Sequence, residues 1–159
     1  MRRSTKSMRS RILLAAVGML AIAPASALAQ AAAGIWLDDE ARAGVELKPC
    51  GDQLCGSIVW LKNLLSPEGK PWTDKLNPDE SKRARPVCGL QVMGDLKKVD
   101  NGGWSGGWVY DPEEGKQFDL ELSMKGNDIL VVRGFWKVKM LGETYEWKRM
   151  PADTPRCKV

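Results

Sequence analysis

The sequence predicts an all-β fold: an antiparallel up-and-down β-barrel of about eight or nine strands, with one short helix in a long loop. Three observations predict it. Apolar and polar residues alternate in short runs, clusters of Gly, Pro, Asn and Asp separate these runs, and most connections are short. An alternation of period two places one row of side chains in a core and the other in solvent. Closure into a barrel protects the edges of such a series most simply, and the sequential hairpins favour it over a β-sandwich.

The first part of the chain holds three predicted strands. Residues 34–38 (GIWLD) form the first, and a turn through Asp-Asp-Glu follows. Residues 44–50 (GVELKPC) alternate valine and leucine with glutamate and lysine. Residues 54–62 (LCGSIVWLK) are apolar almost throughout, which indicates a strand buried on both faces.

A long polar segment, residues 63–86, interrupts the strands. Its sequence NPDE (77–80) places Asn77 as an N-cap, proline at the first helical position and glutamate where a capping box requires an acid. We therefore expect a short helix over Pro78–Arg83, ended before the next proline. Loops of this length are often functional in compact domains. Because it also contains the apolar side chains Leu64, Leu65 and Trp72, we expect the segment to fold across one mouth of the barrel.

The second part of the chain holds the remaining predicted strands. Residues 116–123 (KQFDLELS) are the clearest case, because every second residue is a large apolar one. In the others the alternation is shorter or is interrupted by glycine. Together the predicted strands of this part are residues 89–94, 103–111, 116–123, 129–134, 135–140 and 143–150.

The first 29 residues have the pattern of a cleaved signal peptide. A basic leader precedes an uncharged apolar run over residues 12–23, and Ala27-Leu28-Ala29 supplies a cleavage site after Ala29. The run is too short for a stable membrane anchor. We therefore predict a periplasmic or secreted protein whose single domain is residues 30–159. The leader holds five of the 24 basic residues and no acidic one, so the domain has 19 basic residues against 20 acidic ones. A net charge of −1 gives no reason to expect a nucleic-acid partner.

The four cysteines all lie in the exported domain, which predicts two disulfides in an oxidising compartment. Three pairings are open. One of them closes a short loop between Cys50 and Cys55 and ties Cys88 to the tail at Cys157. The chain contains no histidine, and a site of four thiolates with these spacings is improbable, so we expect no metal.

The order of the motifs resembles a bacterial exported family called domain of unknown function 2147, over nearly all of the domain. The composite of GIW, NP with RP eight residues later, DPxxGK and a terminal WxR carries the resemblance. It implies a lipocalin-like barrel. The family positions fall on Gly34, Trp36, Cys50, Cys55, Gly56, Asn77, Pro78, Arg85, Gly89, Asp111, Pro112, Gly115, Lys116, Gly134, Trp147 and Arg149. Phe118 stands where tyrosine is common, and Tyr145-Glu146 where Thr-Gln is common.

In lipocalin-like barrels an arginine late in the chain packs over the tryptophan of the entry strand. The resemblance therefore implies that Arg149 stacks on Trp36, with Gly34 and Trp147 completing the closed end. A guanidinium gains a cation–π interaction there, and its N–H groups can satisfy carbonyls at the closing edge.

The sequence offers no catalytic constellation. Without histidine there is no Ser-His or Cys-His nucleophile pair, and no Walker loop or dinucleotide fingerprint occurs. Asp74, in the long loop, is the strongest candidate for a functional acid. We therefore expect no enzyme and no cofactor.

Aromatic side chains carry the binding hypothesis. We expect them to line an apolar cavity inside the barrel, where a small apolar or amphipathic molecule such as a fatty acid would bind. The predicted ligand-binding residues are Trp60, Trp108, Tyr110, Phe118, Trp136, Tyr145 and, for an anionic head group, Arg85. The alternative is that the rings fill the core, and that the protein is an envelope structural or protein-interaction module with no ligand. Its protein partner is not evident from the sequence.

Overall fold

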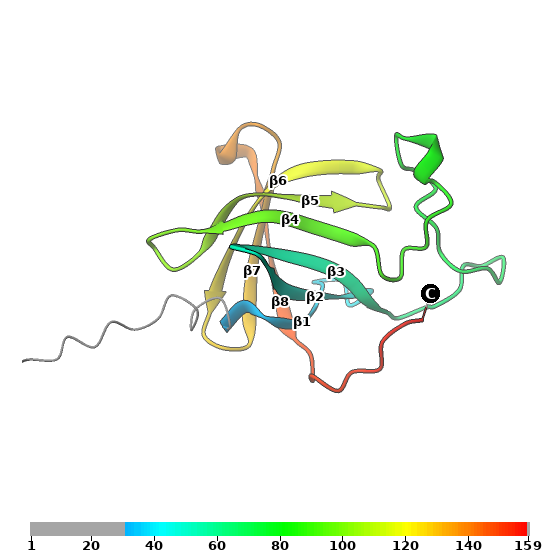
Figure 1. Ribbon diagram of the computed structural model, residues 1–159, viewed down its shortest axis with the longest axis horizontal. Helices are drawn as coiled ribbons and strands as arrows, with labels where there is room; N and C mark the ends of the chain where they lie inside the picture. Colours follow the sequence, from blue (N-terminus) through cyan, green and yellow to red (C-terminus); the bar gives the residue numbers. More distant parts are fainter. Residues whose placement is uncertain (1–30, 159) are drawn as a thin grey trace, which may run out of the picture.

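The computed structural model describes residues 31–158 and confirms the closed antiparallel barrel (Figure 1). The predicted signal peptide and its cleavage site lie outside these residues. The eight strands are β1 (Gly34–Leu37), β2 (Ala43–Cys50), β3 (Gln53–Leu61), β4 (Gln91–Lys98), β5 (Trp104–Asp111), β6 (Lys116–Lys125), β7 (Ile129–Phe135) and β8 (Glu143–Arg149). Among the described residues, none of the helical segments has the length and apolar content that a membrane span requires.

Each strand pairs with the next one along the chain, and β8 closes the barrel by pairing with β1. The connections β1–β2, β3–β4, β5–β6 and β7–β8 therefore lie at one end, which we call the loop end. The connections β2–β3, β4–β5 and β6–β7 lie at the other end, together with the segments that precede β1 and follow β8. We call this the closed end.

The inward side chains toward the closed end fill the barrel. Strands β1 to β7 each contribute to one apolar cluster, and its most deeply buried members are at most 1% exposed. They include Trp36, Leu47, Leu54, Met93, Leu96, Leu120 and Leu130. This burial follows from the alternation seen in the sequence, since Val45 and Leu47 of β2 face Ile58 and Gly56 of β3.

Arg149 and Trp36 shut the closed end. The guanidinium carbon of Arg149 lies 4.1 Å from the ring centroid of Trp36. Its three nitrogens donate hydrogen bonds to the carbonyls of Ala31, Ala33 and Asn127 at 2.7–2.9 Å. A Cβ at Gly34 would lie 2.6 Å from Arg149 Nη1, and Gly34 has φ +134°. Only glycine therefore lets the arginine reach the indole, which explains the Gly-x-Trp spacing.

Two disulfides join the described residues. The hairpin bridge, Cys50–Cys55, spans the β2–β3 turn. The tail bridge, Cys88–Cys157, ties the C-terminal tail to the segment just before β4. These are the pairs of the one arrangement that the spacing suggested.

Two local expectations were wrong. Residues 135–140 do not form a ninth strand: β7 ends at Phe135, and a 3₁₀ turn over Lys139–Leu141 follows. Lys137 has φ +57°, which turns the chain out of the extended conformation. The predicted helix over Pro78–Arg83 is one 3₁₀ turn over Glu80–Lys82, and Asp79 is its N-cap in place of Asn77.

Candidate functional site

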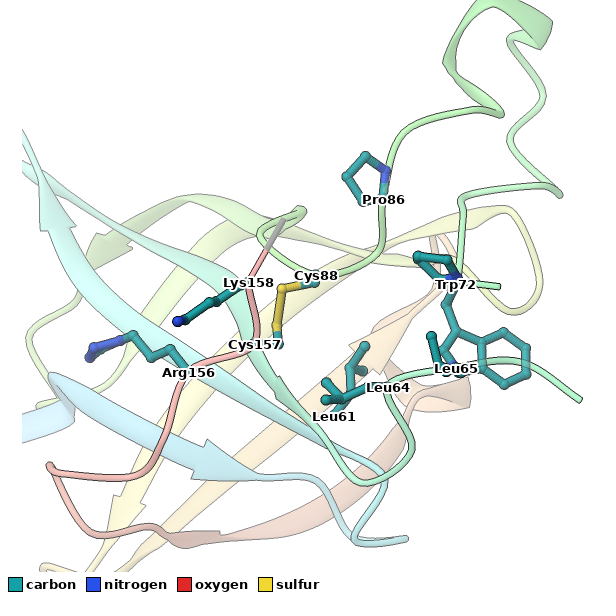
Figure 2. Close-up of a pocket in the computed structure, with 10 residues that line it drawn as sticks. Leu61, Leu64, Leu65, Trp72, Pro86, Cys88, Arg156, Cys157 and Lys158 are labelled. Atoms are coloured by element: carbon teal, nitrogen blue, oxygen red, sulfur yellow. A yellow bond between two sulfur atoms is a disulfide. The ribbon is translucent and has the colours of Figure 1, made fainter. Parts of the chain in front are cut away.

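A pocket of about 570 Å³ lies beside the end of β3, between the long β3–β4 connection and the C-terminal tail (Figure 2). We call it the groove. Its volume is in the range of small-molecule sites. The lining is mostly apolar and consists of Leu61, Leu64, Leu65, Pro71, Trp72, Pro86 and the tail bridge, with Arg156 and Lys158.

Residues 63–72 of the long β3–β4 connection form one wall of the groove. A β-bridge joins Leu65 to Pro71, and the indole N–H of Trp72 donates to the carbonyl of Asn63 at 3.0 Å. Leu64 and Leu65 are more than half exposed although they are large and apolar. Exposed apolar side chains that gather around a hollow indicate a place where something binds.

The opposite wall is the tail. The Cys157 N–H donates to the carbonyl of Val59 at 2.7 Å, so the tail lies against β3 where β4 does not pair with it. In Figure 2 the charged ends of Arg156 and Lys158 lie at the tail side and point away from Trp72. Arg156 also donates to the carboxylate of Glu46. The groove is therefore apolar toward Trp72, and its tail side carries Lys158 and an Arg156 that is paired with Glu46.

A buried polar cluster holds the long connection to the barrel. Asp74 is 0% exposed, and its carboxylate accepts hydrogen bonds from Tyr110 Oη at 2.6 Å, Arg85 Nη2 at 2.7 Å and Asn77 Nδ2 at 2.8 Å. Asn77 Nδ2 lies 3.0 Å from the same tyrosine oxygen. We call these four residues the latch.

The electrostatics of the latch indicate a structural role. Burial alone would raise the pKa of the Asp74 carboxyl, but hydrogen bonds from Tyr110, Arg85 and Asn77 outweigh it and hold that pKa below its usual value. Burial and the acceptor Asp74 raise the pKa of Tyr110 to about 12. A charged acid whose oxygens are all engaged is a poor proton carrier, so Asp74 fits a tether better than a catalytic acid.

The β5–β6 turn packs directly on the part of the long β3–β4 connection that lies between Asp74 and Asn77 of the latch. Gly115 has φ +66°, and a Cβ there would overlap the carbonyl oxygen of Leu76 and lie 2.7 Å from its carbon. The NP, RP and DPxxGK motifs therefore meet at one place, although they are far apart in the sequence.

Three of the aromatic residues predicted to line the interior face outward. Trp108 lies over Gly94 on the outer surface, since a Cβ at Gly94 would be 2.7 Å from its ring. Tyr110 alternates with the inward Val109 and reaches the latch. A register shift in the β2–β3 pairing places Trp60 beside Gly44, near Ile35 and Met150, outside the barrel.

The other three lie toward the loop end. Phe118 and Tyr145 are on inward positions of β6 and β8, whereas Trp136 follows β7 and is 62% exposed. Phe118 and Trp136 meet edge to face, with centroids 6.3 Å apart. The six aromatic residues therefore do not form one cavity lining.

Arg85 and Trp147, which also belong to the predicted site, do not line the groove. Arg85 donates to the buried Asp74, so its guanidinium serves the latch. Trp147 faces inward from β8 opposite Leu130, and among residues 31–158 its indole N–H has no hydrogen-bond partner.

Sequence reasoning missed the groove. Leu61, Pro71 and the tail residues carry no motif, and only the tail bridge brings them beside the long connection. Leu64, Leu65 and Trp72 did give a signal, because they are large apolar residues in a polar segment, but their expected place across the mouth was wrong. The latch holds this segment to the outward side of β5.

No three His, Cys, Asp or Glu side chains come together as a metal site within the described part of the chain. The groove and the latch thus offer apolar contact, hydrogen bonds and positive charge.

Comparisons with known proteins agree with the barrel. A family model described as "Uncharacterized protein conserved in bacteria (DUF2147)" matches residues 34–149. A solved structure from Helicobacter pylori, protein HP1028, which is described as belonging to the lipocalin family, is similar with a TM-score of 0.66 and 25% identity. The match covers 76% of this chain and 83% of that one. No curated protein matches the chain. The chain belongs to the DUF2147 family, as the motifs indicated.

Proposed function

We propose that this DUF2147 protein is an exported binding protein for a small amphipathic anion, and that its binding site is the groove. Lipocalin-like barrels commonly hold one small ligand, which supports a binding role. The observation that carries the proposal is the groove itself: an apolar pocket of about 570 Å³ with Lys158 and the Glu46-paired Arg156 at one edge.

The filled core supports a ligand site outside the barrel axis. A molecule inside the closed end would have to displace side chains that are at most 1% exposed. The groove needs no such displacement, and its leucines and tryptophan are already in contact with solvent. Burying them against an apolar chain gains about 0.8 kcal/mol per CH₂ group of the ligand.

The charge pattern of the groove selects the polar end of the ligand. Lys158 brings positive charge to the tail side, where Arg156 is paired with Glu46, and the side near Trp72 is apolar. A linear molecule with an apolar chain and a carboxylate or phosphate head group matches this pattern, with its chain toward Trp72.

Export supports the same role. Two disulfides are typical of an oxidising compartment, and the leader of residues 1–29 has the pattern of a signal peptide. Expression of the full-length gene in a Gram-negative host tests this part. The mass of the protein in the periplasmic fraction should correspond to a chain that begins at Gln30, and full-length protein retained in the cytoplasm would contradict export.

Calorimetric titration of oxidised residues 30–159 with decanoate tests the binding site. We expect saturable binding at one site, and an affinity that rises about fourfold for each added CH₂ along the fatty-acid series until the groove is filled. The variant Leu64→Asp/Leu65→Asp should lose at least tenfold in affinity. Met140→Asp/Leu141→Asp adds the same charge to another exposed apolar loop and should bind normally.

The charge prediction has its own control. Lys158→Gln should weaken decanoate binding several-fold and leave the binding of neutral decanol unchanged. If the Leu64/Leu65 and Met140/Leu141 variants bind decanoate equally, the groove is not the site. Equal losses on decanoate and decanol for Lys158→Gln would contradict the role of the cationic edge.

One observation favours a second function. The filled closed end suits a barrel that serves as an envelope structural or protein-interaction module without a ligand. Absence of saturable binding for every fatty acid and lysophospholipid tested would favour this alternative.

A further inference from the structure

The exposed large apolar side chains lie toward one end of the barrel. Those in the described chain are Leu64, Leu65, Leu76, Trp136, Val138, Met140, Leu141 and Tyr145. The first three belong to the β3–β4 connection, four belong to the β7–β8 connection, and Tyr145 lies near the start of β8. All of these places are at the loop end.

The β7–β8 connection, residues 136–142, has the highest exposure. We call it the tip loop; it is the orange segment that projects from the barrel in Figure 1. Met140 is 90% exposed and Leu141 is 79% exposed. Soluble proteins rarely leave several such side chains together in water unless the surface binds something.

The tip loop also carries two lysines, of which Lys139 is paired with Glu121 of β6. Lys137 and Lys139 alternate with its apolar residues, and it contains no acidic residue. The Lys137 ammonium lies 5.7 Å from the ring centroid of Trp136, and Lys139 Nζ lies 2.5 Å from Glu121 of β6. Tryptophan with lysine beside aliphatic side chains is the composition that lipid–water interfaces favour, since rings enter the head-group layer and ammonium groups meet phosphates.

We propose that the tip loop docks the loop end of the barrel reversibly on a phospholipid bilayer that contains anionic lipid. Trp136, Met140 and Leu141 enter the head-group layer, and Lys137 contacts lipid phosphates. The short 3₁₀ turn over Lys139–Leu141 presents Met140 and Leu141 at the tip of a narrow projection, which a deformable lipid surface accommodates. This inference does not depend on the groove or its ligand.

Vesicle co-sedimentation of oxidised residues 30–159 tests the proposal without any fatty acid. The vesicles are phosphatidylcholine alone or phosphatidylcholine with 30 mol% phosphatidylglycerol, a composition of about one anionic lipid in three. We expect binding to both, stronger on the anionic vesicles, and a blue shift of tryptophan emission that Trp136→Phe removes.

Met140→Asp/Leu141→Asp should lower vesicle binding at least tenfold. The matched control Leu64→Asp/Leu65→Asp carries the same substitutions on another exposed loop at the same end and should bind vesicles as the native protein does. Lys137→Gln should remove the preference for anionic vesicles and keep the weaker binding to neutral ones. Circular dichroism verifies that each variant is folded.

Three results would overturn the proposal. The native protein would fail to bind either vesicle, or both aspartate pairs would reduce binding equally. Alternatively, analytical ultracentrifugation would show a dimer that Met140→Asp/Leu141→Asp dissociates, which would assign the tip loop to a second copy of the chain. Because decanoate titration uses the opposite aspartate pair as its test, failure of vesicle binding and failure of the groove are distinguishable.

Discussion

Two glycines in similar turns make a matched test of how the long β3–β4 connection packs on the barrel. Gly115 in the β5–β6 turn has φ +66°, and Gly126 in the β6–β7 turn has φ +68°. A Cβ at Gly126 would meet nothing within 4 Å, whereas one at Gly115 would overlap the backbone of Leu76. Gly115→Ala and Gly126→Ala therefore share the backbone strain and differ in the contact with the long connection.

The magnitudes follow from these two terms. Placing alanine in the left-handed conformation destabilises the folded state by about 1–2 kcal/mol. Alanine also lowers the conformational entropy of the unfolded chain, which stabilises the protein by about 0.4–1 kcal/mol, so Gly126→Ala should destabilise by roughly 1 kcal/mol. Overpacking against a backbone adds about 1–3 kcal/mol, so Gly115→Ala should destabilise by roughly 2–4 kcal/mol.

Urea unfolding followed by far-UV circular dichroism measures the difference in unfolding free energy between the two variants, provided that their m-values are equal. Trypsin cleavage within residues 62–85 provides a second measurement, because the segment could move away from the turn and relieve the overlap locally. We expect Gly115→Ala alone to accelerate cleavage or to show the larger loss of stability. Equal stabilities together with equal cleavage rates would refute the contact between the turn and Leu76.

Three further predictions concern the whole barrel. Replacing both cysteines of the tail bridge by serine should lower stability by about 4 kcal/mol, and the same change at the hairpin bridge should lower it by about 2 kcal/mol. The difference arises because the tail bridge joins residues 69 positions apart and the hairpin bridge residues 5 apart. Equal losses in urea unfolding would contradict the loop-length argument. Burial and the hydrogen bond to Asp74 raise the pKa of Tyr110 to about 12, and the hydrogen bond to Glu143 together with burial raises the pKa of Tyr145 to about 12. Absorbance at about 295 nm should therefore show neither of the chain's two tyrosines titrating near the usual pKa of ~10 in the folded protein. Their contribution to stability is complete below pH ~10 and is lost as the pH rises toward 12, and a native titration near 10 would contradict this. Arg149→Lys should destabilise by about 1–3 kcal/mol because it loses the stacking on Trp36 and the fixed fork of donors, whereas Arg42→Lys on the surface should change stability by less than about 0.5 kcal/mol in the same urea assay.

The strands could be predicted because local residue patterns decide them. Alternation and turn residues located all eight, since each hairpin needs only its own sequence to set its period and its turn. Residues 135–140 misled because apolar residues and lysines alternate strictly over 136–140. A left-handed lysine ends the strand there, and nothing in the pattern signals a positive φ at a residue that seldom adopts it.

The facing of the aromatic residues was harder to predict. Trp108, Val109 and Tyr110 are consecutive large apolar residues, so alternation cannot say which of them point inward. The answer depends on Gly94 of the neighbouring strand, which leaves room for an indole on the outer surface. For Trp60, a register shift in the β2–β3 pairing decides the side, and a shift of one residue reverses the face.

The candidate site depends on contacts between distant residues. The resemblance pointed to Asn77 and Arg85, but their partners Asp74 and Tyr110 could be identified only once the long connection had been placed against β5. The groove likewise exists because the tail bridge brings residues 156–158 beside Leu61. No local pattern encodes such a juxtaposition.

The indole N–H resonances of the seven tryptophans test the central claim most directly. Trp72 reports on the groove, Trp147 on the barrel interior and Trp136 on the tip loop. The resonances can be assigned by single Trp→Phe variants in ¹⁵N-labelled residues 30–159. During titration with decanoate, the Trp72 resonance should move in a saturable manner while those of Trp147 and Trp136 stay in place. Saturable movement of the Trp147 resonance with Trp72 unchanged would place the ligand inside the barrel and contradict the groove as the binding site.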